Sequence, residues 1–465
     1  MAKKPKKQRT PQQKKRRRII WFSILGLFLA SLIACAIYLY PVFFNPASLF
    51  DTARGIKQDA SPLNTSLLYQ GEPDPTDEGP LLPEDHVNIL LIGIDLEDKG
   101  YSADYHTDTM IVLSVNFKTG AVDMISLRRD TFAHIPGVYG FYKLNAAINC
   151  GGGIYARDHA GFLKVCEAAE WMLGGISIDY FYALQIPALI EIVDLIGGVD
   201  YNVDISYGPL WPGWQHLNGT DVARYVRARK NMRTGEEGDV NRVKRQKNML
   251  IAIFSKLKNQ NMLAIFPQLA STVNRGVFTN TTMQQTLALL NWARNLDEAS
   301  IGMYSMDGPS FIIMDWAFCF PRQEERVALI SKIYGVDVPQ MTDVNARTAR
   351  WLESYGLRAI KHMATADHIY TYAAEKWGQS PTPAQQRLID ELAARYTEAA
   401  QAYKLAYADP AAGTQTQKMN EAMRALRSAG EALANACDYP TPYRWSPLVD
   451  WTQDSDINEV AVDFR

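Results

Sequence analysis

Arginine side chains are concentrated in one segment of this sequence, YVRARKNMRTGEEGDVNRVKRQ at residues 225–246. Arg227 and Arg229 are two residues apart, so they lie on one side only where the backbone is extended, and the preceding helix should end there. If Arg242 converges with them, the three guanidinium groups form a receptor for phosphate or pyrophosphate, because each donates two parallel hydrogen bonds to oxygens. The alternative is a solvated ion-pair surface, which is common in exposed loops.

The residues that follow predict a helix over 239–258. Asp239, Arg242 and Gln246 are spaced at i, i+3 and i+7 and therefore share one face of that helix. On this face Asp239 would orient an arginine or act as a base.

Two further arginines follow a predicted strand at 121–127, within the segment SLRRDTF. Alternation along a strand sends Arg128 and Arg129 to opposite faces, so only one of them can point into a given site. Lys143 follows in the segment YKLNAA and adds a third cation.

Two carboxylates stand at the ends of predicted strands. Asp95 closes the apolar run VNILLIGID, and Asp108 lies in HTDT, which opens the next strand. Together they would hold Mg²⁺, a hard cation that keeps several waters and shares phosphate oxygens. The alternative is that both are turn or capping residues, but the nearby arginines favour the metal.

Several common sites are excluded by their missing motifs. The sequence has no Gly-rich Walker loop, no GxSxG nucleophile elbow and no HExxH pair, and its seven histidines are scattered. The residues therefore indicate a protein that binds a phosphorylated ligand with arginines and Mg²⁺.

The N-terminus has the pattern of a membrane anchor. Residues 1–18 carry ten Lys or Arg and no acidic residue, and residues 19–40 carry no charge. Twenty-two uncharged residues are long enough to span a bilayer as a helix. The positive-inside rule places the N-terminus in the cytoplasm and the body outside, as in a Gram-positive-type envelope. An outward-facing body argues against nucleic acid as a partner.

Four cysteines follow the anchor: Cys150, Cys166, Cys319 and Cys437. None has CxxC spacing, so zinc is not indicated. An even count outside the membrane permits disulfides, with three possible pairings, and leaves open that all four stay reduced.

The pattern of the residues that follow the anchor predicts an α/β fold with a helical C-terminal extension. Strands at 109–127, joined by a tight turn at Gly120, alternate with helices at 160–173 and 186–197, which is typical of layered α/β domains. From about residue 340 the chain is rich in Ala, Glu, Gln, Arg and Leu, which predicts helices over 345–377 and 384–435. This extension is a candidate for binding a protein partner.

The predicted organisation has five parts. They are a basic cytoplasmic arm at 1–18, a transmembrane signal-anchor helix at 19–40, an extracytoplasmic linker at 41–85, a catalytic domain at 86–335 and a helical C-terminal extension at 336–465.

The motifs of the catalytic domain resemble, in their order, those of the LytR-CpsA-Psr family of cell-envelope phosphotransferases. The matching segments are NILLIGID at 88–95, TDTM at 107–110, SLRRDT at 126–131, KLNAA at 143–147, DLIGGVD at 194–200, HLNG at 216–219, YVRAR at 225–229 and DVNRVKRQ at 239–246.

This resemblance implies a three-layer α/β/α domain with a central mixed sheet. It also implies a Mg²⁺-dependent phosphotransferase, with Mn²⁺ as an alternative metal, and a pyrophosphatase side activity. Such an enzyme moves a glycopolymer, such as wall teichoic acid or capsule, from a polyprenyl-pyrophosphate carrier onto peptidoglycan through a phosphodiester.

The resemblance also assigns roles to residues. Asp95 and Asp108 are the implied metal ligands. The implied catalytic residues are Arg129, Arg227, Arg229, Asp239 and Arg242. The implied pyrophosphate contacts are Arg129, Lys143, Arg227, Arg229, Arg242, Gln246 and His106.

Two positions depart from the family pattern. His106 stands where the family usually has Arg, which weakens one phosphate contact or makes it pH-dependent. Arg128 stands where the family usually has Pro, and it either supplies replacement charge or lies outside the site.

A second function stays open on these departures. The chain would then be a catalytically weak, membrane-anchored binding or regulatory protein for lipid-linked envelope intermediates. A scaffold that uses the helical extension is a third, compatible function.

Overall fold

The computed structural model describes residues 37–50, 86–94, 106–136, 141–228, 239–260, 265, 268, 276–313, 316–341, 344–378, 380–409 and 412–440. The chain divides into two compact units. One comprises Met1–Asp51 with Thr281–Asp297, and the other comprises Thr52–Asn280 with Glu298–Arg465.

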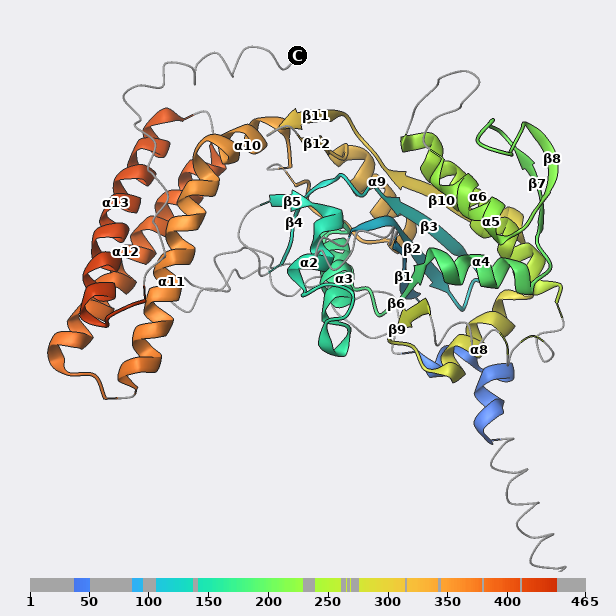
Figure 1. Cartoon of the computed structure of the whole chain (residues 1–465), viewed down its shortest axis with the longest axis horizontal. Coiled ribbons are helices and arrows are strands. Elements are labelled where there is room, and N and C mark those ends of the chain that lie inside the picture. The colour runs from blue at the N-terminus through green and yellow to red at the C-terminus, as the bar shows by residue number, and fades with distance from the viewer. Residues whose placement is uncertain are drawn as a thin grey trace, which may run out of the picture. The chain divides into compact units, whose positions relative to one another are not determined.

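A six-stranded mixed sheet forms the centre of the larger unit, in the order β10-β3-β2-β1-β6-β9 (Figure 1). Its strands are β1 (His86–Ile94), β2 (Thr107–Asn116), β3 (Val122–Leu127), β6 (Tyr180–Gln185), β9 (Val277–Thr279) and β10 (Ile301–Met306). The pairs β1–β6 and β3–β10 are parallel and the other pairs are antiparallel. The predicted tight turn joins β2 to β3, where the N–H of Gly120 donates to the carbonyl of Asn116 at 2.9 Å and Gly120 has φ +74°.

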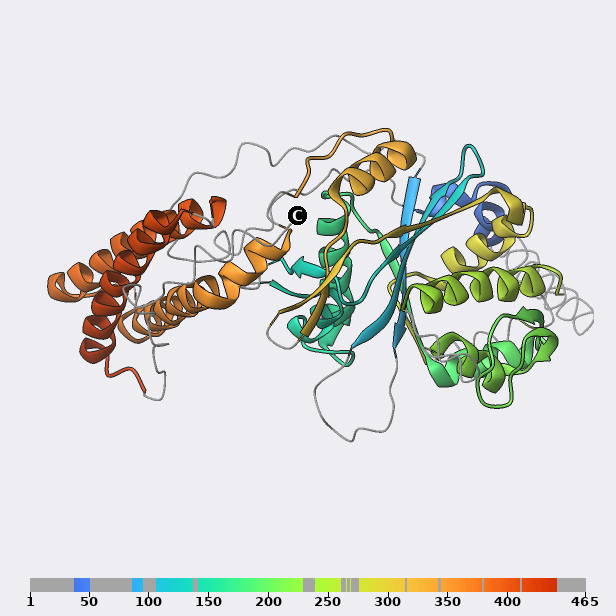
Figure 2. The ribbon, with the colours of Figure 1, turned by 90° about the horizontal axis from the view of Figure 1, so that it is seen from above.

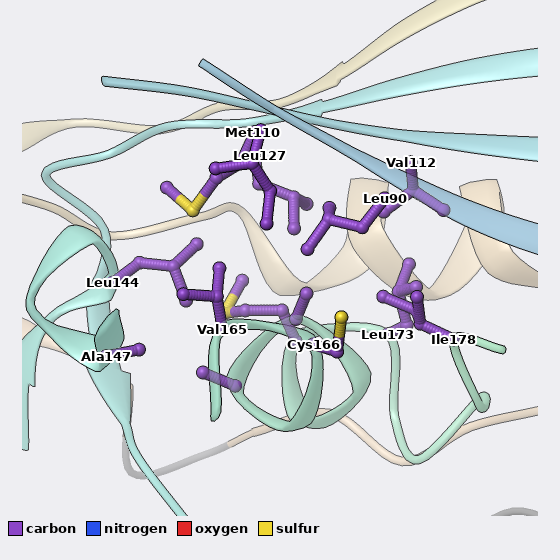
Figure 3. Packing of buried hydrophobic residues seen from close by; sticks show 14 of the residues in the cluster. Leu90, Met110, Val112, Leu127, Leu144, Ala147, Val165, Cys166, Leu173 and Ile178 are labelled. Atoms are coloured by element: carbon purple, nitrogen blue, oxygen red, sulfur yellow. The ribbon is translucent and has the colours of Figure 1, made fainter. Parts of the chain in front are cut away.

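Helices cover both faces of the sheet, which confirms the three-layer prediction (Figure 2). One face is covered by α2 (Ala147–Cys150), α3 (Ala160–Met172) and α9 (Gln323–Tyr334), and the other by α4 (Ile186–Leu195), α5 (Gly219–Arg227) and α6 (Asp239–Lys258). Figure 3 shows the interface between the sheet and the layer that contains α3, where Leu90 and Val112 of the sheet face Val165 and Leu173. These side chains are completely buried. Because helices cover both faces of the sheet, the sequences of its strands are almost continuously apolar.

A second cluster joins α4, α5 and α6 to a two-stranded hairpin of β7 (Val199–Val203) and β8 (Gly213–Leu217). Val222 and Tyr225 of α5 and Met249 of α6 are buried in it. The two arginine-bearing helices are therefore packed together by apolar side chains.

The short elements lie beside the main sheet and helices. They are β4 (Phe132–His134), β5 (Phe141–Lys143), β11 (Ser310–Ile313), β12 (Trp316–Cys319) and the 3₁₀ turns Leu144–Ala146, Arg157–His159 and Glu298–Ser300. β4 pairs with β5 and β11 with β12, both antiparallel.

The C-terminal extension is helical, as predicted. It consists of α10 (Ala346–Trp351), a π-helical turn (Leu352–Gly356), α11 (Leu357–Trp377), α12 (Pro383–Ala408) and α13 (Gly413–Ala436). Within it, α12 packs on α13, and α11 packs on both of them. Its apolar cluster also contains Phe132 and Phe320 of the catalytic domain, so the extension shares a core with that domain.

The smaller unit holds the start of the described chain. Residues 37–44 are helical and a 3₁₀ turn follows at Pro46–Leu49. Three side-chain amides of α8 (Met283–Ala293) donate to this segment: Gln284 to the carbonyl of Tyr38 at 2.5 Å, Gln285 to that of Leu49 at 2.8 Å and Asn291 to that of Val42 at 3.3 Å.

The predicted arm, residues 19–36 of the predicted anchor and residues 51–85 of the predicted linker lie outside the described residues, whereas residues 41–50 of the linker form part of the helix and the 3₁₀ turn. Among the residues that the structure describes, no helix combines the length and the apolar composition needed to cross a bilayer.

The four cysteines beyond the anchor are separate thiols. Burial raises the pKa of the Cys319 thiol to about 11, so that thiol stays protonated near neutral pH.

Candidate functional site

Strand ends meet at one edge of the sheet and bring the predicted residues together. Ile94, the last residue of β1, pairs with Thr107 at the start of β2. Leu127, the last residue of β3, pairs with Met110 on one side and with Met306 on the other. The residue that precedes β2 and the residues that follow β3 and β10 therefore share this edge.

Four charged side chains form a row of alternating sign at this edge. Arg129 Nη1 lies 2.5 Å from Asp108 Oδ1, and Arg129 Nε lies 3.3 Å from Asp130 Oδ2. Lys143 Nζ donates to Asp130 Oδ1 at 2.8 Å. All four side chains are between 17% and 20% exposed, so the row lies at the surface but is largely screened from water. The sequence predicted Asp108, Arg129 and Lys143; Asp130 is the residue that connects them.

The position of Asp130 between two cations controls its ionisation. Burial is the largest effect and acts to raise the pKa of this carboxyl group, but Lys143 and Arg129 together outweigh it and hold the pKa below its usual value. Asp130 is thus a carboxylate that orients the guanidinium plane of Arg129.

Arg128 points to a different partner, as strand alternation predicted. Its Nη1 lies 2.8 Å from Oδ1 of Asp307, the residue that follows β10. The same oxygen accepts the N–H of Gly308 at 2.8 Å. Arg128 therefore ties the end of β3 to the end of β10, and its charge is already matched by a carboxylate.

Asp307 was not predicted as a site residue. It is 179 residues from Arg128 in the chain, and only the parallel pairing of β3 with β10 brings the two together. No local pattern in the sequence marks such a pair.

The helix α5 ends at Arg227, the first arginine of the segment 225–246, as predicted. The side chain of Asn218 caps α5 by accepting the N–H of Asp221 at 2.9 Å, and the extended backbone of Ala228 (φ −62°, ψ 119°) ends it. Arg227 is half-buried, and its Nε donates to the carbonyl of Ala223 at 3.3 Å. The guanidinium group is thereby held along the last turn of α5.

The predicted helix over 239–258 matches α6. On the face that carries Arg242 and Gln246, Arg242 is 3% exposed and Gln246 is 9% exposed. Gln246 Nε2 donates to the carbonyl of Val226 at 3.2 Å, so this predicted phosphate contact also joins α6 to α5.

Two neighbouring cations, which the sequence did not single out as site residues, hold α6 in place. Arg245 donates to the carbonyl of Ala228 and lies over the ring of Tyr225, 5.9 Å from its centroid. Lys247 Nζ donates to the carbonyl of Tyr304 and to Ser305 Oγ, each at 3.0 Å, and burial lowers the pKa of this amine. Because Asp307 follows these two residues of β10, the helix with Arg242 and the row at the sheet edge are attached to the same strand.

The remaining predicted residues are less fully described. His106 precedes β2 and is exposed. Asp239 is the first residue of α6, but its side chain lies outside the described part, as do Asp95 and Arg229.

The donor set fits a hard cation at Asp108. Its Oδ1 accepts from Arg129, and a carboxylate offers about four lone-pair positions over two oxygens, so Asp108 can serve an arginine and a metal together. Asp95, the second predicted ligand, follows Ile94 in the sequence but lies outside the described residues. No cluster of three His, Cys, Asp or Glu residues with metal-binding geometry occurs in the described ranges.

The chain is similar to named transferases. A polyisoprenyl-teichoic acid–peptidoglycan teichoic acid transferase TagU of Bacillus mycoides (strain KBAB4) is 26% identical over 275 residues, which cover 57% of this chain and 80% of the relative. The protein of the same name in Bacillus subtilis (strain 168) is 29% identical over 206 residues, covering 43% and 61%. The crystal structure of B. subtilis TagV matches with a TM-score of 0.46 and 23% identity, over 56% of this chain and 100% of that one.

A family model matches residues 55–334, more than half of the chain and all of the segments that form the site. This chain belongs to the LytR_cpsA_psr family.

Proposed function

We propose that this protein is a membrane-anchored phosphotransferase that attaches a lipid-linked glycopolymer to peptidoglycan. The acceptor hydroxyl attacks the phosphorus next to the sugar, a phosphodiester forms, and the bond to the second phosphate breaks so that polyprenyl phosphate leaves. The hydroxyl proton passes to a carboxylate, for which Asp239 is the candidate. The named activity of the Bacillus relatives supports this reaction class.

The row of alternating charges is the observation that carries the proposal. Arg129 is held by Asp108 on one side and by Asp130 on the other, with Lys143 behind Asp130. Such a guanidinium group loses little freedom when it binds a phosphate oxygen, because its orientation is set beforehand.

The helix-borne arginines supply the excess positive charge in this proposal. Within the row, two cations face two carboxylates, so the row itself is close to neutral. Arg227 and Arg242 come from α5 and α6 and would neutralise the pyrophosphate, together with Arg229.

Mg²⁺ is part of the proposal, with Mn²⁺ as a substitute. Asp108 and Asp95 would hold it, and when bound it would neutralise charge on the pyrophosphate oxygens. Arg129, 2.5 Å from Asp108 Oδ1, would hold the carboxylate in the orientation that this role needs.

The proposed location is the outer side of the cell membrane, with the uncharged segment 19–40 as a single-pass anchor and the basic arm 1–18 in the cytoplasm. Fractionation tests this location: the full chain should sediment with membranes, and a chain that starts at residue 37 should not. A chain that stays soluble with residues 1–36 present would refute the anchor.

The activity is tested with the full-length protein in detergent, a polyprenyl-pyrophosphate-linked sugar, soluble peptidoglycan fragments and Mg²⁺. Arg129→Ala, Asp108→Ala and Arg227→Ala should each reduce the transfer rate on the order of 10²-fold or more. Arg224→Ala is the matched control, since Arg224 lies on the same helix but is 44% exposed and pairs with Asp221. It should transfer at the wild-type rate.

Two outcomes would contradict the proposal. Turnover that survives in Arg129→Ala and Asp108→Ala would place the chemistry elsewhere. Tight binding of the lipid-linked sugar without transfer, on several donors, would instead support the binding or regulatory protein and direct attention to His106.

A further inference from the structure

The hairpin of β7 and β8 exposes two large aromatic side chains. Trp211 is 61% exposed and Trp214 is 75% exposed, whereas Phe162 and Phe181 of the same unit are completely buried. The two tryptophans are three residues apart in the sequence, and large exposed apolar side chains of this kind occur at interaction surfaces.

One face of the hairpin combines an aromatic ring with polar side chains. Trp214 of β8 pairs with Asn202 of β7, and His216 pairs with Asp200. All four are exposed, while the residues that alternate with them are half-buried or buried. His216 Nδ1 lies 2.7 Å from Asp200 Oδ1. The ring of Trp214 therefore lies next to groups that accept and donate hydrogen bonds.

This face is fixed next to the candidate site. Asp204 follows β7 and accepts the hydroxyl of Tyr225 at 2.9 Å, and Arg245 Nη1 lies 3.9 Å from its other oxygen. Arg245 also donates to Ala228, the residue after Arg227. The end of the hairpin where Trp214 pairs is thus attached to the end of α5 that carries Arg227, in agreement with the position of β7 and β8 beside α5 and α6 (Figure 1).

The net charge of this face indicates whether it binds an anionic or a neutral partner. Its single carboxylate, Asp200, is paired with His216 and lies 4.0 Å from Lys256 Nζ, so the face is close to neutral. None of its four residues is Lys or Arg, which an anionic lipid surface or a polyanionic polymer would require. A neutral partner with an apolar face and hydroxyl groups fits best.

We propose that the face formed by Asp200, Asn202, Trp214 and His216, together with Trp211, binds the neutral pyranose chain of the acceptor glycan. The C–H face of a sugar ring stacks on Trp214, as apolar surfaces stack on the faces of aromatic rings. Asn202 and the Asp200–His216 pair bind hydroxyl and acetamido groups. This inference rests on the proposed function, since the bound chain would present its hydroxyl to the site at the end of α5.

The test is calorimetric titration of the full-length protein in detergent with an N-acetylglucosamine hexamer. Trp214→Ala should weaken binding about tenfold, the factor that corresponds to the loss of one stacked aromatic. Trp214→Tyr should keep most of the affinity, because the ring face is retained. Tyr155→Ala is the matched control: Tyr155 is 71% exposed but is not part of the hairpin, so affinity should not change.

Three results would overturn the inference. These are no binding of the hexamer to the wild type, equal affinity in Trp214→Ala and the wild type, and Trp214-dependent binding to phosphatidylglycerol vesicles in place of the sugar. Sugar binding that depends on Trp214 in a protein without transferase activity would support the hairpin site and refute the proposed function. Transfer that is insensitive to Trp214→Ala, with no hexamer binding, would do the reverse.

Discussion

At the level of single residues, the order of charges decides what the sheet edge can hold. Lys143, Asp130, Arg129 and Asp108 alternate in sign, so each has an opposite neighbour within 3.3 Å. The row consequently fixes the orientations of Arg129 and Asp108 and contributes little net charge. Two predictions concern these residues.

The first prediction concerns pH. The folded-state pKa of Asp130 is lowered, so the ionised carboxylate stabilises the protein above the unfolded-state pKa of about 3.9, and that stability is lost as pH falls through the lower, folded-state pKa. Asp130→Asn should therefore cost about 1–2 kcal/mol near pH 7 and progressively less as the pH falls below about 3.9. Urea denaturation over this pH range measures this difference. Glu421→Gln, at an exposed position of α13, should show no comparable dependence.

The second prediction separates the two adjacent arginines. Arg128 and Asp307 pair at 2.8 Å, with side chains 14% and 30% exposed, so a double-mutant cycle of Arg128→Gln and Asp307→Asn should give a coupling energy of about 1 kcal/mol in unfolding. Transferase activity should fall far less in Arg128→Gln than in Arg129→Gln. Additive effects on stability, or equal losses of activity, would contradict the assignment of Arg128 to a structural role.

At the level of elements, the site depends on how two helices are held together. Gln246 and Arg245 of α6 donate to the backbone at the end of α5, and Lys247 donates to β10. Backbone carbonyls at a helix end lack partners within the helix, so side chains from a neighbouring helix satisfy them.

Arg245→Met should therefore loosen the end of α5. We expect a loss of about 2 kcal/mol in unfolding free energy, because a buried, charged hydrogen bond to Ala228 and the contact with Tyr225 are removed. Turnover should also fall, since Arg227 stands at the released end. Equilibrium denaturation and steady-state kinetics measure the two effects; Arg224→Met on the exposed side of α5 should change neither.

Within the C-terminal extension, the position of a leucine on α12 predicts its contribution to stability. Leu392 is completely buried and Leu405 is 51% exposed. Leu392→Ala should cost about 2–5 kcal/mol, and Leu405→Ala should be close to neutral. Thermal and urea denaturation of the two variants compare them directly, and equal effects would refute the packing of α12.

At the level of the whole molecule, the extension and the catalytic domain share an apolar cluster. Phe132, Phe318 and Phe320 of the domain are buried in the same cluster as Leu352, which precedes α11. Removing residues 344–465 should therefore lower the soluble yield and the unfolding temperature of the domain, because these rings become exposed. A truncated domain as stable as the full chain, judged by calorimetry and light scattering, would show that the cluster contributes little.

Local patterns predicted the elements of the fold well. The end of α5 at Arg227 and the helix over 239–258 could both be predicted, because they depend on contacts within about four residues of the chain. Strand alternation predicted that Arg128 and Arg129 point to opposite faces, and their separate partners, Asp307 and Asp108, agree with that prediction. The metal pair and the full arginine cluster stay predictions, since Asp95 and Arg229 lie outside the described residues.

The sequence by itself thus determined the first strands of the sheet, several of the helices that cover it, the helical extension, and the charged groups that stand at the ends of these elements. Only the tertiary structure decided that Asp307 neutralises Arg128, that Lys247 attaches α6 to β10, and that the extension shares a core with the domain. These contacts depend on the order of strands in the sheet and on packing between segments far apart in the chain, and short-range patterns do not encode that order.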